Sequence, residues 1–186
     1  MRVIGGVARG AHLKGPPDKG TRATADKVRE AMFNVLAIYI EGARVLDLFS
    51  GTGALGIEAL SRGALGCDFV ERRPALCAII RENLARTRLA EHGRVIQASV
   101  HQVLSTLTGP YDLILADPPY MDVDGPGLVD SPALHRLLAP AGIVVLEHSP
   151  RVVVRGQAGP LRFVRTREYG DSAVSFWQAR EEGDEE

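Results

Sequence analysis

The hydrophobic positions of the chain alternate between short apolar runs and stretches with one apolar face. Segments that read as strands occupy residues 45–47, 66–71, 94–98, 111–116, 142–147, 161–168 and 173–178. Helical spacing of apolar residues begins near Thr24 and recurs over residues 57–61, 75–84 and 134–138. Strands that alternate with helices in this way favour parallel pairing. The pattern therefore predicts an α/β fold with a doubly wound, mostly parallel sheet of about seven strands.

Both ends of the chain carry turn signals. The first thirteen residues predict a short β-hairpin with its turn at Gly5-Gly6 or Arg9-Gly10, followed by a loop at Gly15-Pro16-Pro17. Near the other end, Tyr169 to Ser172 predicts the turn between the last two strands. We expect residues 1–180 to form one domain with a basic extension over residues 1–20, and residues 181–186 to form an acidic tail.

The glycine-rich stretch that follows the first strand is the strongest local signal. Gly51, Gly53 and Gly56 match the pattern G-x-G-x-x-G, which allows a tight turn, lets a ligand lie against the backbone and lets a helix pack closely. Such a triplet alone is a weak signal, because it also occurs in turns that bind nothing.

Asp47 changes the interpretation of this turn. A carboxylate at the end of the first strand would repel the pyrophosphate of a dinucleotide and would favour a cationic ligand. The run Asp-Leu-Phe-Ser-Gly-Thr-Gly, which includes Phe49, resembles the first motif of class I S-adenosylmethionine-dependent methyltransferases. The resemblance implies a site for a methyl donor that has a sulfonium cation and no phosphate.

Two later strand ends add candidates for the same site. Glu71 lies 20 residues after Gly51, at the end of the second strand, where a carboxylate can accept hydrogen bonds from ribose hydroxyls. Ser99 and Val100 follow the third strand and are placed to meet an adenine, although Asp or Asn at position 99 would be more persuasive.

The sequence Asp117-Pro118-Pro119-Tyr120 follows the buried fourth strand. An exocyclic amine on a base is a poor nucleophile because its lone pair is delocalised, so an enzyme must extract the base and hold the amine hydrogens. Asp117 and the carbonyl of Pro118 offer two acceptors on a rigid turn, and Tyr120 offers a stacking face. The motif resembles the fourth motif of amino-methyltransferases that act on adenine N6, guanine N2 or amide nitrogens.

Composition and charge place limits on the partners. The 186 residues are 45% hydrophobic and 24% charged, with no apolar run near the ~18 residues of a membrane helix and no signal peptide, so we expect a cytoplasmic protein with no membrane partner. Cys67 and Cys77 lack zinc-ligand spacing, and no metal is expected. Residues 1–30 hold seven lysines and arginines against three acidic residues, a local charge of +4 within a net charge of −1. This segment supplies the candidate contacts to RNA phosphates: Arg2, Arg9, Lys14 and Arg22.

Five blocks in this order give a narrower resemblance. They are the opening Arg-Val-Ile-Gly-Gly-Val-Ala-Arg-Gly, the charged helix Arg22 to Glu30, Asp47 to Ala64, Asp117 to Tyr120, and Tyr169-Gly-Asp171. Together they resemble the bacterial RsmD family, and the likeness runs to about Trp177. The resemblance implies a Rossmann-like fold whose last strand is antiparallel, S-adenosylmethionine as cofactor, and methylation of N2 of guanine 966 in 16S ribosomal RNA within the small subunit. Ala23, Ala25 and Ser99 depart from the family pattern and affect the expected packing around the cofactor.

Other functions share parts of these motifs. A DNA or RNA adenine-N6 methyltransferase carries both motifs, although the DNA enzymes usually add a target-recognition domain for which this chain has no room. A protein-glutamine methyltransferase favours Asn at position 117. A nicotinamide-dependent oxidoreductase leaves Asp117 to Tyr120 unexplained, and a non-catalytic RNA-binding module would be indifferent to Asp117. The reading we prefer is a monomeric ribosomal RNA methyltransferase.

Overall fold

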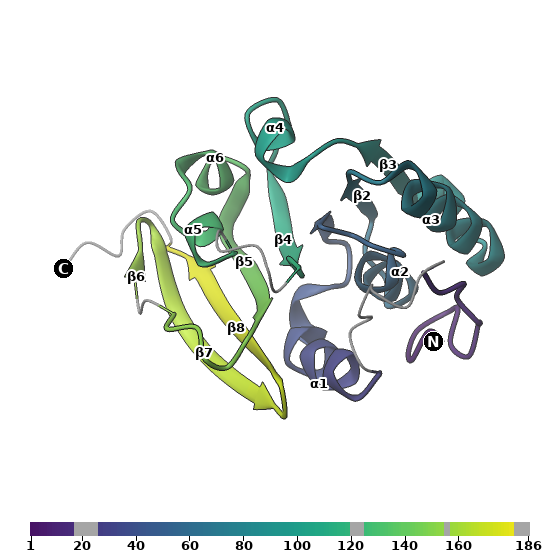
Figure 1. Cartoon of the computed structure of the whole chain (residues 1–186), viewed down its shortest axis with the longest axis horizontal. Coiled ribbons are helices and arrows are strands. Elements are labelled where there is room, and N and C mark those ends of the chain that lie inside the picture. Colours follow the sequence, from purple (N-terminus) through teal and green to yellow (C-terminus); the bar gives the residue numbers. More distant parts are fainter. Residues whose placement is uncertain (17–25, 120–124, 155–156, 181–186) are drawn as a thin grey trace.

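The central feature of the computed structural model, which describes residues 1–16, 26–119, 125–154 and 157–180, is a sheet of eight strands. The order across the sheet is β3-β2-β1-β4-β5-β8-β7-β6 (Figure 1). The strands are β1 (Arg44–Leu48), β2 (Gly66–Glu71), β3 (Gly93–Gln97), β4 (Tyr111–Ala116), β5 (Leu138–His148), β6 (Gln157–Ala158), β7 (Leu161–Tyr169) and β8 (Ser172–Ala179).

The strand directions confirm the predicted topology. Neighbouring strands from β3 through β5 pair in parallel, whereas β8 pairs antiparallel with both β5 and β7. The seven predicted strands and the antiparallel last strand are therefore confirmed, and the two-residue β6 adds an eighth strand beside the start of β7. Chain order reverses between β1 and β4, which is where ligands bind in sheets of this type.

Two hydrophobic cores lie on the two faces of the sheet, because successive strand residues point to opposite sides. On β1, Val45 belongs to the core under α1, α2 and α3, whereas Leu46 and Leu48 belong to the core under α4, α5 and α6. The helices are α1 (Asp26–Leu36), α2 (Ala54–Ser61), α3 (Pro74–Thr87), α4 (Val100–Leu104), α5 (Gly125–Val129) and α6 (Pro132–His135), with short 3₁₀ turns η1 (Ala37–Tyr39) and η2 (Ala90–His92).

The N-terminal segment pairs with itself less than predicted. Arg2 and His12 form a single antiparallel bridge, and Val3 donates its N–H to the carbonyl of Ala11 at 3.0 Å. No strand is assigned to either arm among residues 1–16, so the predicted hairpin is reduced to this bridge. The arms instead form hydrogen bonds with α2, as described below.

Two predicted boundaries differ for local physical reasons. Helical spacing predicted a helix over residues 134–138, but α6 ends at His135 and β5 already begins at Leu138. The helix α4 was not predicted, since only five residues form it and a window that short carries little periodicity. It starts where Ser99 caps it, with the Ser99 Oγ accepting from the Gln102 N–H at 3.4 Å.

Gly56 allows α2 to lie directly against β2. A Cβ atom at this position would lie 2.3 Å from Cε1 of Phe69 and 2.6 Å from Sγ of Cys67. Both neighbours are buried, so neither can move away without disturbing the core. The sequence assigned this glycine to close helix packing, and the contacts agree.

We expect Gly56→Ala to lower the free energy of unfolding by about 1–3 kcal/mol, the usual cost of overpacking a core. Chemical denaturation measures this change. Gly127→Ala is the control, because a Cβ there meets nothing within 4 Å. Equal stability of the Gly56 variant and the wild type would show that the helix can retreat at no cost.

Candidate active site

The glycine turn and the Asp117 turn lie side by side at the carboxyl edge of the sheet. Strands β1 and β4 are neighbours with Leu48 opposite Ala116. The backbone N–H of Asp117 points to the carbonyl of Leu48, with a nitrogen–oxygen distance of 3.4 Å. The register therefore brings together two motifs that are about 70 residues apart in the chain.

The glycine turn has a backbone that few side chains tolerate. Phe49, Gly51 and Gly53 have φ angles of 58°, 56° and 80°. The Ser50 hydroxyl fixes the turn by donating to the carbonyl of Asp47 at 2.6 Å. A left-handed Phe49 is unusual for a bulky residue and costs conformational energy, which is common at ligand sites.

Gly51 leaves one side of this turn open. A Cβ placed on it would meet no atom closer than the carbonyl oxygen of Phe49 at 4.0 Å. Gly53 differs, because a Cβ there would lie 3.1 Å from the side chain of Ile80. The open backbone at Gly51 is thus the position at which a ligand can lie against the turn.

Asp47 is buried beneath the turn and bonds to the first turn of α2. Its Oδ2 accepts a hydrogen bond from the N–H of Gly56 at 3.0 Å. Burial raises the pKa of Asp47 to about 7; the Gly56 bond opposes the rise and the negative charge of Glu71 adds to it. A cationic ligand nearby would offset this cost of ionisation, as the sequence analysis proposed.

Glu71 joins the end of β2 to the same turn. Its Oε2 accepts from the N–H of Gly51 at 3.0 Å, and its Oε1 accepts from the N–H of Arg73 at 2.8 Å. A carboxylate has about four lone-pair positions, so both oxygens keep acceptor capacity for ligand hydroxyls. The carboxylate is nearly buried and lies beside the backbone of Gly51.

Ser99 and Val100 follow β3 at the same edge. The N–H of Ala98 donates to the carbonyl of Glu71 at 3.1 Å, which holds this segment beside the end of β2. The Ser99 hydroxyl bonds within the first turn of α4, where it donates to Oε1 of Gln102 at 2.8 Å. Val100 is buried in the core under α4. These two residues therefore help shape the edge, and their predicted contact with adenine stays a prediction.

The Asp117 turn is placed above the junction of β1 and β4. Asp117 is half-buried, Pro118 is buried and Pro119 is exposed. Tyr120, predicted as a stacking residue, lies outside the described residues.

The basic candidates of the N-terminal segment are on the surface. Arg2, Arg9 and Lys14 are exposed, whereas Arg22 lies outside the described residues. Lys14 donates from Nζ to Oε2 of Glu82 at 2.6 Å. Arg2 and Arg9 are thus exposed on the surface, whereas Lys14 forms an ion pair with Glu82.

Asn83, which the sequence analysis did not single out, connects this segment to the glycine turn. Its Oδ1 accepts from the Lys14 N–H at 2.7 Å, and its Nδ2 donates to the carbonyls of Lys14 at 3.1 Å and Thr52 at 3.0 Å. Asn83 is completely buried. An amide among the apolar residues of a predicted helix was the available signal.

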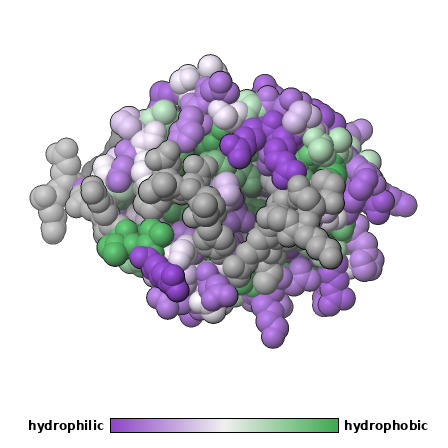
Figure 2. Space-filling view, viewed as in Figure 1, coloured by the Kyte–Doolittle hydropathy of each residue, from purple (hydrophilic) through white to green (hydrophobic). Residues whose placement is uncertain are grey.

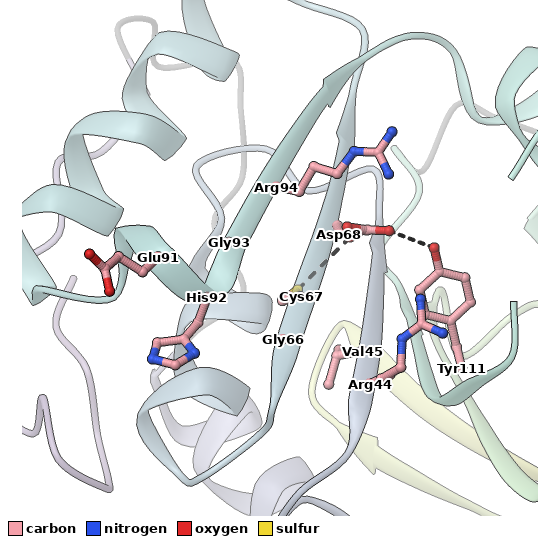
Figure 3. A pocket seen from close by; sticks show the side chains of 10 residues that line it. All are labelled: Arg44, Val45, Gly66, Cys67, Asp68, Glu91, His92, Gly93, Arg94 and Tyr111. Atoms are coloured by element: carbon pink, nitrogen blue, oxygen red, sulfur yellow. Dashed lines mark hydrogen bonds between the residues drawn. The ribbon is translucent and has the colours of Figure 1, made fainter. Parts of the chain in front are cut away.

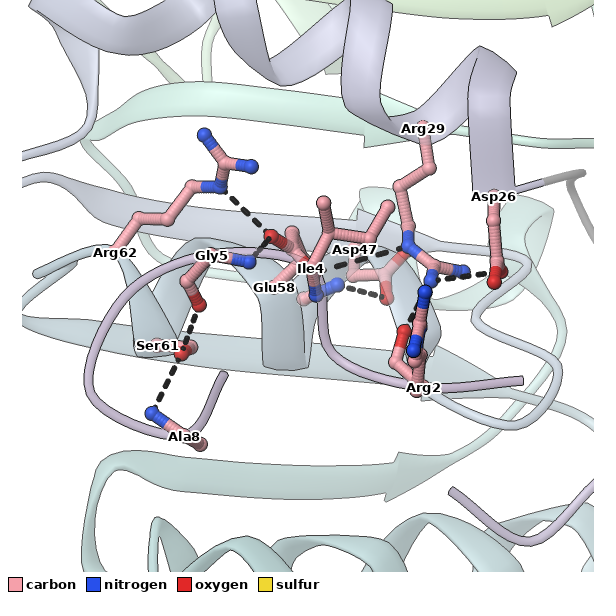
Figure 4. Close-up of polar contacts among 11 residues, drawn as sticks. Arg2, Ile4, Gly5, Ala8, Asp26, Arg29, Asp47, Glu58, Ser61 and Arg62 are labelled. Atoms are coloured by element: carbon pink, nitrogen blue, oxygen red, sulfur yellow. Dashed lines mark hydrogen bonds and ion pairs between the residues drawn. The ribbon is translucent and has the colours of Figure 1, made fainter. Parts of the chain in front are cut away.

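Glu58 fixes the other end of the segment (Figure 4). This buried carboxylate accepts from the N–H groups of Ile4 and Gly5, each at 2.8 Å, and from Nε of Arg62 at 2.7 Å. Ser61, one turn further on α2, donates to the carbonyl of Gly5 at 2.6 Å. The chain can approach this closely only because Gly5 and its successor lack side chains.

Arg29 of α1 completes this buried charged cluster. Its Nη2 donates to the carbonyl of Arg2 and to Oδ1 of Asp26, and its Nε lies 3.7 Å from Oε2 of Glu58. Arg29 is fully buried and Glu58 nearly so, and each therefore depends on nearby groups of opposite charge, with Asp26 beside Arg29 and Arg62 beside Glu58. At least one charged residue of the predicted helix Arg22 to Glu30, Arg29, therefore has a structural role.

A pocket of about 180 Å³ lies at the opposite edge of the sheet (Figure 3). It is lined by the first residues of several strands, including Arg44, Asp68, Arg94 and Tyr111. The Tyr111 hydroxyl donates to Oδ2 of Asp68 at 2.6 Å. None of the predicted site residues lines this pocket.

Clusters of metal ligands and membrane-spanning helices are both absent from the described residues. They contain no group of three or more His, Cys, Asp or Glu side chains that could hold a metal ion. None of the described helices is long and apolar enough to cross a membrane. Cys67 and Cys77 are both buried and form no disulfide.

Comparison with known proteins identifies relatives over the whole chain. A family model described as "Conserved hypothetical protein 95" matches residues 1–178. "Putative rRNA methyltransferase YlbH" of Bacillus subtilis (strain 168) is 36% identical over 184 residues, which cover 97% of this chain and 100% of that protein. "Ribosomal RNA small subunit methyltransferase D" of Escherichia coli (strain K12) is 42% identical over 120 residues, covering 64% of this chain and 60% of that protein.

The fold has a close match among solved structures. "Putative methyltransferase yhhF from Escherichia coli" superposes with a TM-score of 0.85 at 32% identity, covering 97% of this chain and 98% of that one. The match includes the N-terminal segment as well as the sheet, because so little of either chain is left out.

The buried Asp47 makes stability depend on pH. Its pKa rises from 3.8 to about 7 on folding, so the folded protein binds a proton more tightly and stability falls as pH increases across that range. Asp47→Asn keeps an acceptor for Gly56 and removes the charge. We expect the variant to melt several °C above the wild type at pH 8 and to lose most of this advantage at pH 5, as measured by thermal unfolding.

The exposed Asp130 offers a matched control. Asp130→Asn should shift the melting temperature by the same small amount at both pH values. A difference between Asp47→Asn and wild type that does not change with pH would contradict the assignment.

Proposed function

Because the chain belongs to the RsmD family of ribosomal RNA small subunit methyltransferases, we propose that it methylates the exocyclic N2 amine of a guanine in 16S ribosomal RNA. The modified base is proposed to be guanine 966. The observation that supports this most is the meeting of two motifs at the ends of β1 and β4, where Asp117 donates its N–H to Leu48. One motif suits a cationic methyl donor and the other suits an amine.

The methyl donor is S-adenosylmethionine. The residues at the glycine turn fit this group: the backbone at Gly51 is open, Glu71 keeps acceptor capacity for ribose hydroxyls, and Asp47 is a buried carboxylate that gains from a nearby cation. We propose that Phe49, Gly53, Ser99 and Val100 line the rest of the cofactor site.

The proposed chemistry is an in-line displacement. When bound, the cofactor supplies a methyl group on a positively charged sulfur, and the C–S electron pair stays on sulfur when the guanine nitrogen forms its bond to carbon. Asp117 and the carbonyl of Pro118 accept the two N–H groups of the amine, which orients its lone pair towards the methyl group. The extra proton then leaves through Asp117. Tyr120 is proposed to stack on the extracted base.

The substrate surface is proposed to include the basic N-terminal segment. Arg2 and Arg9 are exposed, and Glu58 and Asn83 fix the backbone between and beyond them. We propose that residues 1–180 act as one monomeric methyltransferase domain on 16S ribosomal RNA in the cytoplasm, within an assembled or assembling small subunit.

A DNA or RNA adenine-N6 activity is the remaining alternative, since Asp117 and Pro118 could also hold an adenine amine. Mass spectrometry of the modified RNA separates the two reactions by locating the methyl group on guanine or adenine. Membership of a methyltransferase family removes the nicotinamide-dependent oxidoreductase considered from the sequence.

Asp117 and Glu71 should separate chemistry from cofactor binding. We expect Asp117→Ala to reduce single-turnover methyl transfer at least 100-fold while changing the Kd for S-adenosylhomocysteine less than about threefold.

Glu71→Ala should instead make the binding free energy of S-adenosylhomocysteine less favourable by about 1.5–3 kcal/mol through lost charge-assisted hydrogen bonds. Titration calorimetry and rapid-quench assays measure the two effects. Rapid methylation by the Asp117 variant would reduce Asp117 to a turn residue.

The small ribosomal subunit should be a better substrate than protein-free 16S RNA. A protein that contacts few phosphates binds RNA weakly and with strong salt dependence, so recognition needs the shape of an exposed loop held by ribosomal proteins. We expect a higher kcat/KM on small subunits that lack the methyl group than on protein-free 16S RNA at one near-physiological salt concentration. Equal values would show that the proteins contribute nothing.

A further inference from the structure

The strand β7 presents a row of arginines that the proposed reaction does not yet use. Arg162, Arg165 and Arg167 are all exposed on this strand. Within the described residues, β6 pairs only with Leu161 and Arg162, so the rest of β7 forms a free edge of the sheet. Figure 2 shows hydrophilic residues next to a small hydrophobic patch over this part of the molecule.

A β-bulge places the three arginines on one face. Side chains alternate between faces along a strand, so residues 162, 165 and 167 would not share a face in a regular strand. The pairing of β7 with β8 shifts by one residue between Phe163 and Arg165, which leaves Val164 as the extra residue. Bulges of this kind redirect side chains and are common beside functional sites.

The cross-strand partners identify that face. Arg165 pairs with Phe176 and Arg167 pairs with Val174, and both partners belong to the core under α1, α2 and α3. Arg162 pairs with Gln178, to which its guanidinium donates at 3.3 Å. The arginines therefore lie on the same side of the sheet as the N-terminal segment, which contacts α2 and α3.

The row is also level with the Asp117 turn. Ala116 pairs with Leu146, Leu146 with Ser175, and Ser175 with Thr166, so Thr166 lies in the same row across the sheet as the last residue of β4. Arg165 and Arg167 flank Thr166 in sequence. Three strand spacings separate β7 from β4, a distance of about 14 Å.

From this placement we propose that Arg162, Arg165 and Arg167 bind backbone phosphates of the RNA substrate on one side of the target base. The proposal rests on the proposed RNA methyltransferase function and adds a second contact surface to it. Figure 1 shows β7 and the N-terminal segment on opposite sides of the end of β4. RNA that contacts both surfaces must cross the site between them, which would align the base with Asp117.

Guanidinium groups suit this partner. Arginine forms bidentate hydrogen bonds with phosphate oxygens and remains charged at any pH of interest. Glu168, the acidic neighbour, pairs with Ala173 and so points to the opposite face. Alternation along the strand thus separates Arg165 and Arg167 from the one acidic side chain of β7.

The test compares three variants of the full chain. The double variant Arg165→Ala/Arg167→Ala removes two of the proposed contacts. Arg44→Ala/Arg94→Ala removes two exposed arginines from the amino ends of β1 and β3, where the pocket lies, and causes the same change in net charge. Arg167→Glu/Glu168→Arg keeps the net charge and moves one positive charge to the other face.

Binding to a protein-free 16S RNA fragment is measured by fluorescence anisotropy between 50 and 200 mM salt, alongside single-turnover methylation of small subunits. We expect the Arg165/Arg167 double variant to bind RNA about tenfold more weakly, with a salt slope smaller by about 1–2. The charge-swapped variant should be weakened similarly, and the Arg44/Arg94 variant should match the wild type. Thermal unfolding and the Kd for S-adenosylhomocysteine should be unchanged in all three.

Three outcomes would overturn the proposal. Unchanged RNA affinity and salt slope in the double variant would exclude these contacts. Equal losses in the Arg44/Arg94 variant would show an effect of net charge alone. Normal RNA binding with impaired methylation of subunits would assign the row to a ribosomal protein instead. If the wild type binds RNA through the row but methylates no guanine, the proposed function fails while the surface stands.

Discussion

The close contact between α2 and β2 is the constraint on which the site depends. Because Gly56 has no side chain, α2 can lie against Phe69 and Cys67, and its N–H can reach the carboxylate of Asp47. That bond satisfies one of the orphan donors at the start of α2 and holds the carboxylate beneath the glycine turn. If α2 moved away from β2, Asp47 would lose its hydrogen bond from Gly56 and the glycine turn would lose its support. The packing of α2 and the hydrogen bonding of Asp47 therefore depend on each other.

A second buried charge gives the N-terminal segment its place. Glu58 and Arg29 lie between α1, α2 and the first residues of the chain, and most of their partners are backbone groups of that segment. Each charge also has a second partner of opposite sign, Arg62 for Glu58 and Asp26 for Arg29, so the cluster is a connected network of buried and partly exposed charges. The segment is thus held by polar contacts that require its backbone in one position. This explains how thirteen residues with a single β-bridge can present Arg2 and Arg9 in a defined way.

The sequence predicted the parts of the fold that have strong local signals. The bounds of β2 and β4 agree with the predicted strands, because the apolar residues of each strand give way to an acidic residue, Glu71 at the end of β2 and Asp117 after β4. The glycine turn and the Asp117 turn were each predicted to follow a strand, and the parallel pairing of β1 with β4 brings the two turns together. Asn83, Glu58 and Arg29 could not be assigned roles in this way, since each bonds to a backbone group more than 25 residues distant. The bulge at Val164 was equally hidden, because one extra residue changes no periodicity that a short strand can reveal.

Asn83 has a thermodynamic consequence beyond its hydrogen bonds. One amide group touches the backbone of Lys14 on one side and the carbonyl of Thr52, in the glycine turn, on the other. Two ligands that each bias the position of this side chain are linked, and the coupling free energy between them is the same in both directions. If a ligand at the glycine turn changes the affinity of the N-terminal segment for its partner by some factor, that partner changes the affinity for the ligand by the same factor. The order in which the two arrive can then change the kinetics but never the total free energy of the ternary complex.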